Sequence, residues 1–230
     1  MSSNHITSSA LTHFNHPTRI LISGRSTSGK TTLAVQLITK HLLRGLRRCY
    51  AVCPTFYSQR TLLPLVRVKG AFQKKDVFLD PSNDAFDHVF EQQRMYPVPA
   101  LLFVDDAAAE ACTNAGSKGS FARLCIAAPH LNLTIVAVFQ ALKQCTLAMR
   151  TNCEILISFQ PNGIKEVETI LEEFNPCPSA PDSKIAVKHM LTQAWNQNRY
   201  AVICKTKFHP MFNPFSKMRF YSGFNHEIVV

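Results

Sequence analysis

The segment LISGRSTSGKTTLAVQLI, residues 21–38, restricts the fold of this chain more than any other stretch. It holds two glycines five residues apart, and the second is followed directly by Lys30 and Thr31. A short apolar run at residues 19–23 comes before the glycines, and apolar residues at helical spacing follow from residue 31 to about residue 43. A strand, a glycine-rich turn and a helix in this order predict a phosphate-binding loop.

This loop has a defined chemistry. Its glycines allow backbone N–H groups to surround phosphate oxygens, and the start of the helix adds the positive end of a dipole. We expect Lys30 to reach the β- and γ-phosphates and Thr31 to place its hydroxyl on Mg²⁺, so ATP and Mg²⁺ are the expected ligands. The predicted ATP-binding residues are Gly24, Arg25, Ser26, Thr27, Ser28, Gly29, Lys30, Thr31 and Thr32.

Two acids follow a second apolar run, LLFVDD, at residues 101–106. Asp105 is the predicted metal-side carboxylate, because the strand that carries this group in phosphate-loop enzymes is apolar and ends in an acid. Asp106 is the predicted catalytic base that polarises the attacking water. The alternative for Asp106 is a helix-capping or solvated side chain.

A third polar strand end is Gln140, which closes the run TIVAVFQ. Ligands of parallel sheets bind at the carboxyl ends of the strands. Gln140 is therefore a candidate to orient the attacking water and to report loss of the γ-phosphate, although a polar strand end without a function is the alternative. A strand inserted between the phosphate-loop strand and the Asp105 strand is the arrangement of the additional-strand ATPases, and the Gln140 strand is the predicted insertion.

Short apolar runs alternate with helical patterns along the whole chain, which predicts an α/β fold with a central, mostly parallel sheet and helices on both faces. The predicted strands lie at residues 19–23, 49–53, 100–106, 133–140, 154–159 and 200–204. We expect three regions: a flexible N-terminal arm at 1–18, a phosphate-loop ATPase domain at 19–208 and a basic C-terminal extension at 209–230.

The charge balance points to an anionic partner. Lys and Arg number 25 against 15 Asp and Glu, a net charge of +10, which favours nucleic acid, with a basic protein that has no such partner as the alternative. Lys118, in a loop of small residues at 113–120, is a candidate for contact with DNA. The eight cysteines form no CxxC pair and no secretory signal is visible, so we expect reduced thiols inside a cell. No apolar run reaches the ~20 residues of a membrane span.

Four segments together carry a family resemblance. GRSTSGKTT, LLFVDD, TIVAVFQ and AMRTNCEILISF, in this order, resemble the viral genome-packaging ATPases of the FtsK–HerA superfamily, the type found in poxviruses, other large DNA viruses and virophages. The resemblance covers roughly residues 19–205. The double acid at 105–106 looks like the poxvirus-type group, and Gln140 looks like the sensor of that superfamily.

The resemblance implies a RecA-like motor that moves double-stranded DNA into a preformed capsid. It implies a homo-oligomeric ring, hexameric or pentameric, docked at a capsid vertex. Arg150 is then a candidate catalytic arginine that acts in trans on a neighbour's ATP, and Lys118 is a candidate pore-loop contact to DNA phosphate. The alternative for Arg150 is a salt-bridged residue at a helix end. The implied location is the host cytoplasm or nucleus at a virus factory, or the virion, in soluble form.

Other functions remain open from the sequence alone. A small-molecule kinase of nucleoside type shares the phosphate loop, but no arginine-rich lid is evident. A switch GTPase is excluded because no guanine-reading Asn-Lys-x-Asp motif is present in a suitable place. A scaffold with a relict loop and a non-packaging DNA-pumping ATPase are the remaining alternatives.

Overall fold

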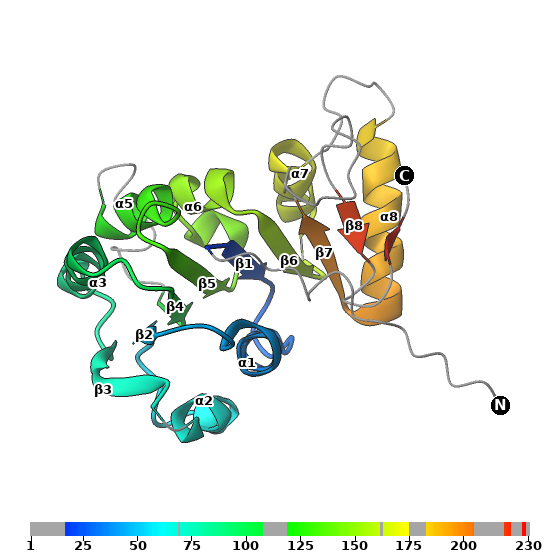
Figure 1. The fold of residues 1–230 in the computed structure, drawn as a ribbon. Coiled ribbons are helices and arrows are strands. Elements are labelled where there is room, and N and C mark those ends of the chain that lie inside the picture. The colour runs from blue at the N-terminus through cyan, green and yellow to red at the C-terminus, as the bar shows by residue number, and fades with distance from the viewer. Residues whose placement is uncertain are drawn as a thin grey trace.

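A computed structural model gives the fold of the chain (Figure 1). The structure describes residues 17–68, 70–107, 119–161, 163–174, 183–204, 219–221 and 227–228.

One sheet runs through these residues in the order β3-β2-β4-β5-β1-β6-β7-β8-β9. The first six of these strands are parallel, and β7, β8 and β9 each pair antiparallel with the strand before them. The parallel strands are β1 (Arg19–Ser23), β2 (Arg48–Val52), β3 (Phe72–Phe78), β4 (Ala100–Asp105), β5 (Leu133–Phe139) and β6 (Ile155–Phe159). The antiparallel strands are β7 (Tyr200–Cys204), β8 (Arg219–Tyr221) and β9 (Glu227–Ile228).

Helices cover both faces of the sheet, as Figure 1 shows with α5 and α6 on one side and α1 and α2 on the other. The first face is covered by α3 (Asn83–Met95), α5 (Ser120–Ala127), α6 (Leu147–Asn152), α7 (Ile164–Glu173) and α8 (Ser183–Asn198), which share one apolar cluster with the sheet. A second cluster contains α1 (Lys30–Leu37), its π-helical continuation (Ile38–Leu42), the 3-10 turn η2 (Arg60–Leu62) and α2 (Leu63–Arg67). A further 3-10 turn, η4 (Leu142–Gln144), follows β5.

The central strands are buried on both faces, which explains their apolar sequences. Every residue of β4 and of β5 is buried. β5 lies between β1 and β4, with Phe139 beside Ser23 and Val138 beside Asp105. The structure therefore confirms the predicted fold class and the predicted insertion of the Gln140 strand between the phosphate-loop strand and the Asp105 strand.

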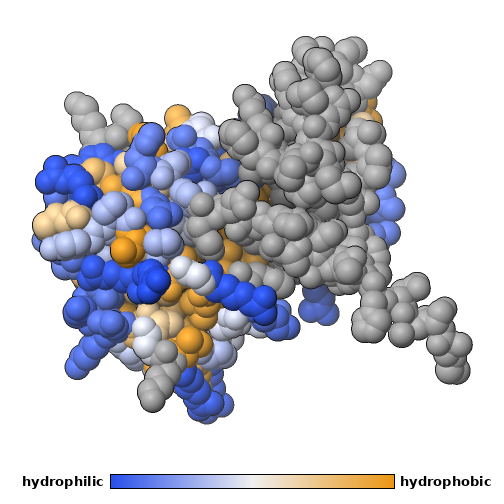
Figure 2. All heavy atoms as spheres, viewed as in Figure 1, coloured by the Kyte–Doolittle hydropathy of each residue, from blue (hydrophilic) through white to orange (hydrophobic). Residues whose placement is uncertain are grey.

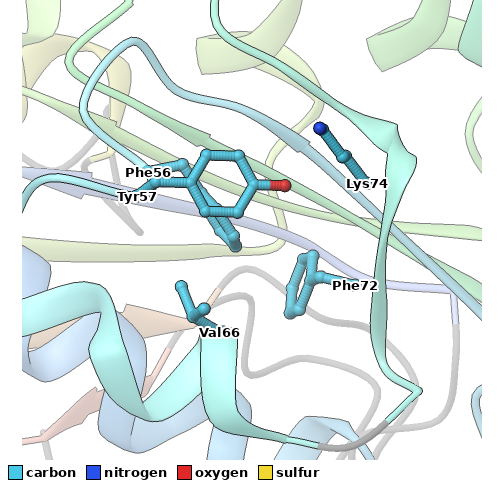
Figure 3. Close-up of a pocket in the computed structure, with 5 residues that line it drawn as sticks. All are labelled: Phe56, Tyr57, Val66, Phe72 and Lys74. Carbon is cyan, nitrogen blue, oxygen red and sulfur yellow. The ribbon is translucent and has the colours of Figure 1, made fainter.

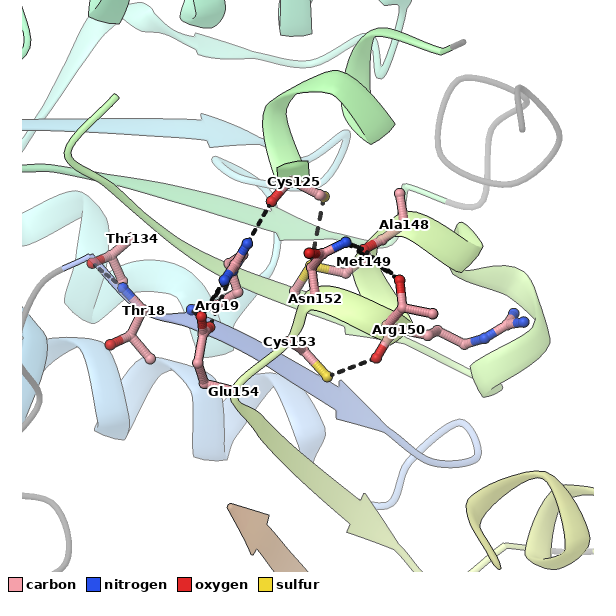
Figure 4. A network of polar contacts seen from close by, with 11 residues as sticks. Thr18, Arg19, Cys125, Thr134, Ala148, Met149, Arg150, Asn152, Cys153 and Glu154 are labelled. Atoms are coloured by element: carbon pink, nitrogen blue, oxygen red, sulfur yellow. Dashed lines mark hydrogen bonds and ion pairs between the residues drawn. The ribbon is translucent and has the colours of Figure 1, made fainter. Parts of the chain in front are cut away.

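Polar contacts fasten the amino ends of the three central strands (Figure 4). The guanidinium of Arg19, at the start of β1, pairs with Glu154 just before β6 and donates to the carbonyl oxygen of Cys125 on α5 at 3.0 Å. The N–H of Thr18 donates to the hydroxyl of Thr134 on β5 at 3.3 Å. These contacts fix β1 between β5 and β6 at the amino ends of the strands. This end of the sheet is opposite the phosphate loop.

The structure adds elements that the strand predictions do not contain. β3 and the long helix α3 lie within residues 55–99, where no strand is predicted. The strand at 200–204 is not the last one, because β8 and β9 come from the range predicted as an extension beyond the domain and continue the sheet.

The exterior is mixed in character. Figure 2 shows hydrophilic residues along the α3 side of the molecule with hydrophobic residues between them. In the described part of the chain, no helix combines the length and the apolar character that crossing a bilayer requires.

Candidate nucleotide site

The loop between β1 and α1 is shaped by close packing against β6. A Cβ atom at Gly24 would lie 2.5 Å from the Cβ of Phe159, so only glycine fits there. Gly29, with φ of 97°, and Thr27, with φ of 64°, take left-handed conformations that turn the chain into the helix. A non-glycine residue in this conformation is a small reservoir of strain of the kind found at ligand clamps.

Lys30 crosses the loop from the first turn of α1. Its Nζ donates to the carbonyl oxygen of Arg25 at 2.6 Å, and the residue is 8% exposed. Burial lowers the pKa of Lys30, while the charges of Asp105, Asp106 and Glu166 act in the opposite direction. The ammonium group is thus enclosed by the loop and partly desolvated, which favours its interaction with a phosphate.

Thr31 and Asp105, the two predicted metal ligands, are in direct contact. The Thr31 hydroxyl donates to Oδ2 of Asp105 at 2.8 Å, and the N–H of Asp106 donates to Oδ1 at 2.9 Å. Burial is the main reason that the pKa of Asp105 rises to about 6, and the two hydrogen bonds oppose it. The ionised form is therefore costly without a cation nearby.

The donors at this point fit Mg²⁺ together with nucleotide phosphate. A hydroxyl and a carboxylate are the hard oxygen ligands that Mg²⁺ selects, and phosphates and water usually complete its shell. Among the described residues, no group of three or more His, Cys, Asp and Glu could hold a metal by itself. Thr31 and Asp105 would thus hold the ion jointly with phosphate oxygens.

Hydrogen-bond donors without partners also face the loop. In the described structure the buried hydroxyl of Ser28 has no hydrogen-bond partner, and it lies 3.2 Å from the position of a Cβ at Gly24. The first N–H groups of any α-helix have no intrahelical acceptor, and no side chain caps the amino end of α1. Phosphate oxygens would satisfy both kinds of donor.

Asp106 lies just beyond the carboxyl end of β4. Its backbone has φ of 53°, a conformation that Asp tolerates better than most residues, and its side chain is exposed. The turn places the carboxylate near enough to Lys30 for its charge to act on the ammonium group. Its role as a base stays a prediction, because no contact with another described residue fixes the carboxylate.

Gln140 follows the last residue of β5, so it lies between the ends of β1 and β4. The carbonyl oxygen of Phe139 accepts a hydrogen bond from the N–H of Gly24 at 3.3 Å, which joins β5 to the phosphate loop. The Gln140 side chain is exposed, and the backbone N–H of Gln140 donates to Oε1 of Gln144 at 3.2 Å. The role of Gln140 in orienting water stays a prediction.

Arg150 is engaged within its own chain. Its Nε donates to Oε2 of Glu173 at 2.9 Å, and its Nη1 donates to the carbonyl oxygens of Leu142 and Cys145 at 3.3 and 3.0 Å. In Figure 4 its side chain extends from α6 away from the contacts around Arg19. These contacts support the alternative given above, a salt-bridged structural residue, and the action in trans stays a prediction that they do not support.

Sequence reasoning missed Glu166, the third acid near Lys30. Glu166 is in the first turn of α7, and its Oε1 accepts the N–H of Leu142 at 3.0 Å. No sequence motif marks it, because only the packing of α7 on the turn after β5 brings it to the site. Lys118, the predicted contact to DNA, lies outside the described residues.

A separate surface pocket of about 460 Å³ lies between α2 and β3 (Figure 3). Its lining is aromatic and aliphatic with one cation: Phe56, Tyr57, Val66, Phe72 and Lys74. None of these residues belongs to the phosphate loop or to the acids around it. The pocket is therefore a feature of the sheet edge and not a part of the nucleotide site.

Comparisons with solved structures find this fold in viral packaging enzymes. The genome packaging NTPase B204 of Sulfolobus turreted icosahedral virus 2, in complex with sulfate, matches with a TM-score of 0.59 at 13% identity over 94% of this chain and 99% of that chain. Its complex with AMPPCP matches with a TM-score of 0.55 at 12% identity over 90% and 98%. The DNA-packaging ATPase B204 of Sulfolobus turreted icosahedral virus matches with a TM-score of 0.58 at 12% identity over 94% and 100%.

The fold of this chain is the fold of these packaging NTPases. At this identity the likeness establishes the architecture and not the activity. No protein-family model matches the sequence, and no curated protein does.

Proposed function

We propose that the protein is an ATPase that moves double-stranded DNA into a viral capsid as part of a homo-oligomeric ring. The observation that carries the proposal is the contact of Thr31 with Asp105 across the inserted strand β5. This contact joins the phosphate loop to the metal-side acid in an additional-strand sheet. The nearly full-length likeness to B204, which is described as a DNA-packaging ATPase, supports the same function.

In this proposal each residue has a separate task. Lys30 turns from the Arg25 carbonyl to the β- and γ-phosphates, and Thr31 and Asp105 hold Mg²⁺, which neutralises phosphate charge when bound. Asp106 and Gln140 orient the attacking water at the ends of neighbouring strands. A net charge of +10 supports contact with the DNA backbone, and phosphate contacts carry no sequence information. DNA binding is therefore expected to be independent of sequence and weaker at high salt.

The test is the ATP hydrolysis rate of the purified protein with and without double-stranded DNA. We expect DNA to increase the rate, and we expect Lys30→Ala to abolish hydrolysis in both conditions while leaving the fold intact by circular dichroism. A DNA-independent protein that phosphorylates a nucleoside would instead be a small-molecule kinase. Full biological activity of Lys30→Ala would support a scaffold with a relict loop.

The packaging role needs a second test, because a DNA-pumping ATPase outside a capsid would pass the first one. Mass measurement with ATPγS and DNA is expected to give a ring of five or six subunits. Binding of that ring to empty capsids, and not to filled ones, would distinguish packaging from other DNA transport.

A further inference from the structure

The first three backbone N–H groups after β5 donate to side chains of nearby helical segments. The N–H groups of Gln140 and Ala141 both donate to Oε1 of Gln144 at 3.2 Å. The next N–H, that of Leu142, donates to Oε1 of Glu166 at 3.0 Å. Three consecutive N–H groups after the strand end are thus fixed, and the third depends on α7.

The other end of α7 holds the same residue, Leu142, through Arg150. Glu173 pairs with Arg150, and Arg150 donates to the carbonyl oxygen of Leu142. Glu166 and Glu173 are seven residues apart, which places them on one face of the helix two turns from each other. The N–H and the C=O of Leu142 are therefore tied to opposite ends of one helix.

The turn that Glu166 holds is also joined to the phosphate loop. The N–H of Gly24 donates to the carbonyl oxygen of Phe139 at 3.3 Å, and Gln140 follows Phe139 directly. A rearrangement of the loop on binding or losing the γ-phosphate would thus be passed to this turn.

We propose that Glu166 is a positioning residue that holds the turn carrying Gln140 and passes the state of the phosphate site to α7. The inference rests on the proposed ATPase function, and it adds a residue and a direction of coupling. The hydrogen bond to Leu142 fixes where Gln140 lies. The hydrogen bond between Gly24 and Phe139 joins that turn to the phosphate loop, so a change in the loop reaches Glu166 through the turn.

A simpler role for Glu166 is to stabilise its own helix, since an acid in the first turn interacts favourably with the helix dipole. Glu168 provides the matched control. It lies on the same helix two residues further on, its side chain is exposed, and it has no contact to the turn after β5 among the described residues. Glu166→Gln is the second useful variant, because an amide oxygen can still accept the N–H of Leu142.

The first experiment compares steady-state ATP hydrolysis of these variants. We expect Glu166→Ala to lower kcat by about 10-fold, the effect of one lost hydrogen bond to a charged acceptor, with KM for ATP changed by less than about 3-fold. Glu166→Gln is expected to recover most of kcat, and Glu168→Ala to equal the wild type. An unchanged kcat in Glu166→Ala would overturn the proposal. A loss in Glu166→Gln as large as in Glu166→Ala would also overturn it, because the group would then act through its proton or charge and not by positioning.

The second experiment needs no hydrolysis and so separates this inference from the proposed function. Amide hydrogen exchange at residues 140–142 of the nucleotide-free protein is expected to be about 10-fold faster in Glu166→Ala than in the wild type or in Glu168→Ala. Addition of ATPγS with Mg²⁺ is expected to change exchange along 164–173 in the wild type and not in Glu166→Ala. Equal exchange in all nucleotide-free proteins would overturn the positioning role, and a wild type that binds ATPγS without a change in α7 would overturn the coupling. Failure of the wild type to bind ATPγS would instead count against the proposed function alone.

Discussion

Thr31 and Asp105 are 74 residues apart in the sequence, yet the hydroxyl of one donates to the carboxylate of the other at 2.8 Å. Their strands are not neighbours, because β5 lies between β1 and β4. The contact forms because α1 begins at the carboxyl ends of these strands and turns its first residues toward β4. Two segments that recognise phosphate and metal separately are thus united before any ligand binds.

The raised pKa of Asp105 predicts that the free energy of unfolding of the metal-free protein depends on pH. A carboxyl group whose pKa rises from 3.8 to about 6 on folding contributes most to stability when protonated, and this contribution is lost as the pH rises from about 4 to about 6. Asp105→Asn lacks this titration. We expect its free energy of unfolding, relative to the wild type, to increase by about 3 kcal/mol between pH 4 and pH 7. Urea unfolding in EDTA at both pH values measures this, and an equal difference at both would contradict the prediction.

Gly24→Ala should disrupt the loop by steric conflict. The new methyl group would lie 2.5 Å from the Cβ of Phe159, which no change of rotamer can move away. We expect β1 and β6 to separate locally, at a cost of about 1–3 kcal/mol in urea unfolding, with loss of ATP binding. Gly163→Ala is the control, because nothing lies within 4 Å of its added methyl group. Equal stability of the two variants would contradict the predicted steric conflict at Gly24.

Arg150→Ala tests a structural role against action in trans. The change removes the guanidinium group that donates to the carbonyl oxygens of Leu142 and Cys145 and pairs with Glu173, so we expect a loss of about 1–3 kcal/mol in the free energy of unfolding. A variant of normal stability but no turnover would instead favour action in trans. In that case, mixing it with Lys30→Ala subunits should restore hydrolysis, because each subunit then supplies what the other lacks.

Trp195 anchors α8 to the strand beside β1. It is the single tryptophan of the chain, it is 5% exposed, and its indole N–H donates to the carbonyl oxygen of Ser158 at 2.9 Å. Trp195→Phe removes this donor and is expected to lower the free energy of unfolding by about 1–2 kcal/mol. Thr192→Ala, at an exposed position of the same helix, should change the free energy of unfolding by less than about 0.5 kcal/mol. Unfolding followed by circular dichroism measures both variants. Equal losses would mean that the indole hydrogen bond is not an anchor.

The buried parallel strands and the phosphate loop were predictable from sequence because their signals are local. An apolar run that ends in Gly or Asp identifies a strand and its carboxyl end at the same time, as at β1 and β4.

β3 was not predicted because its sequence, FQKKDVF, resembles that of a solvent-exposed loop. It is an edge strand, and its polar residues 73–75 are exposed. Asp76 is nevertheless 1% exposed, because Arg48 on β2 pairs with it at 2.6 Å. A buried acid of this kind is explained only by a partner on another strand, which no local pattern reveals.

The contacts of Glu166 and Arg150 were not predictable for the same reason, because they join separate segments of the chain. Glu166 lies on a helix with an ordinary amphipathic pattern, and its importance comes from the packing of α7 on the turn after β5. Arg150 was assigned by resemblance to a role between subunits, and the structure shows that its guanidinium joins three segments of one chain. Sequence position identified the element in both cases but not the direction of the side chain.

The placement of β1 between β5 and β6 has a consequence for synthesis on the ribosome. Both partners of β1 come after residue 132, so the phosphate loop emerges long before the strands that shape it. At about 5–20 residues per second, the delay is on the order of ten seconds. During that time an apolar strand is exposed without partners. The nascent chain therefore passes through a period in which the phosphate loop lacks the two strands that hold it in the folded protein.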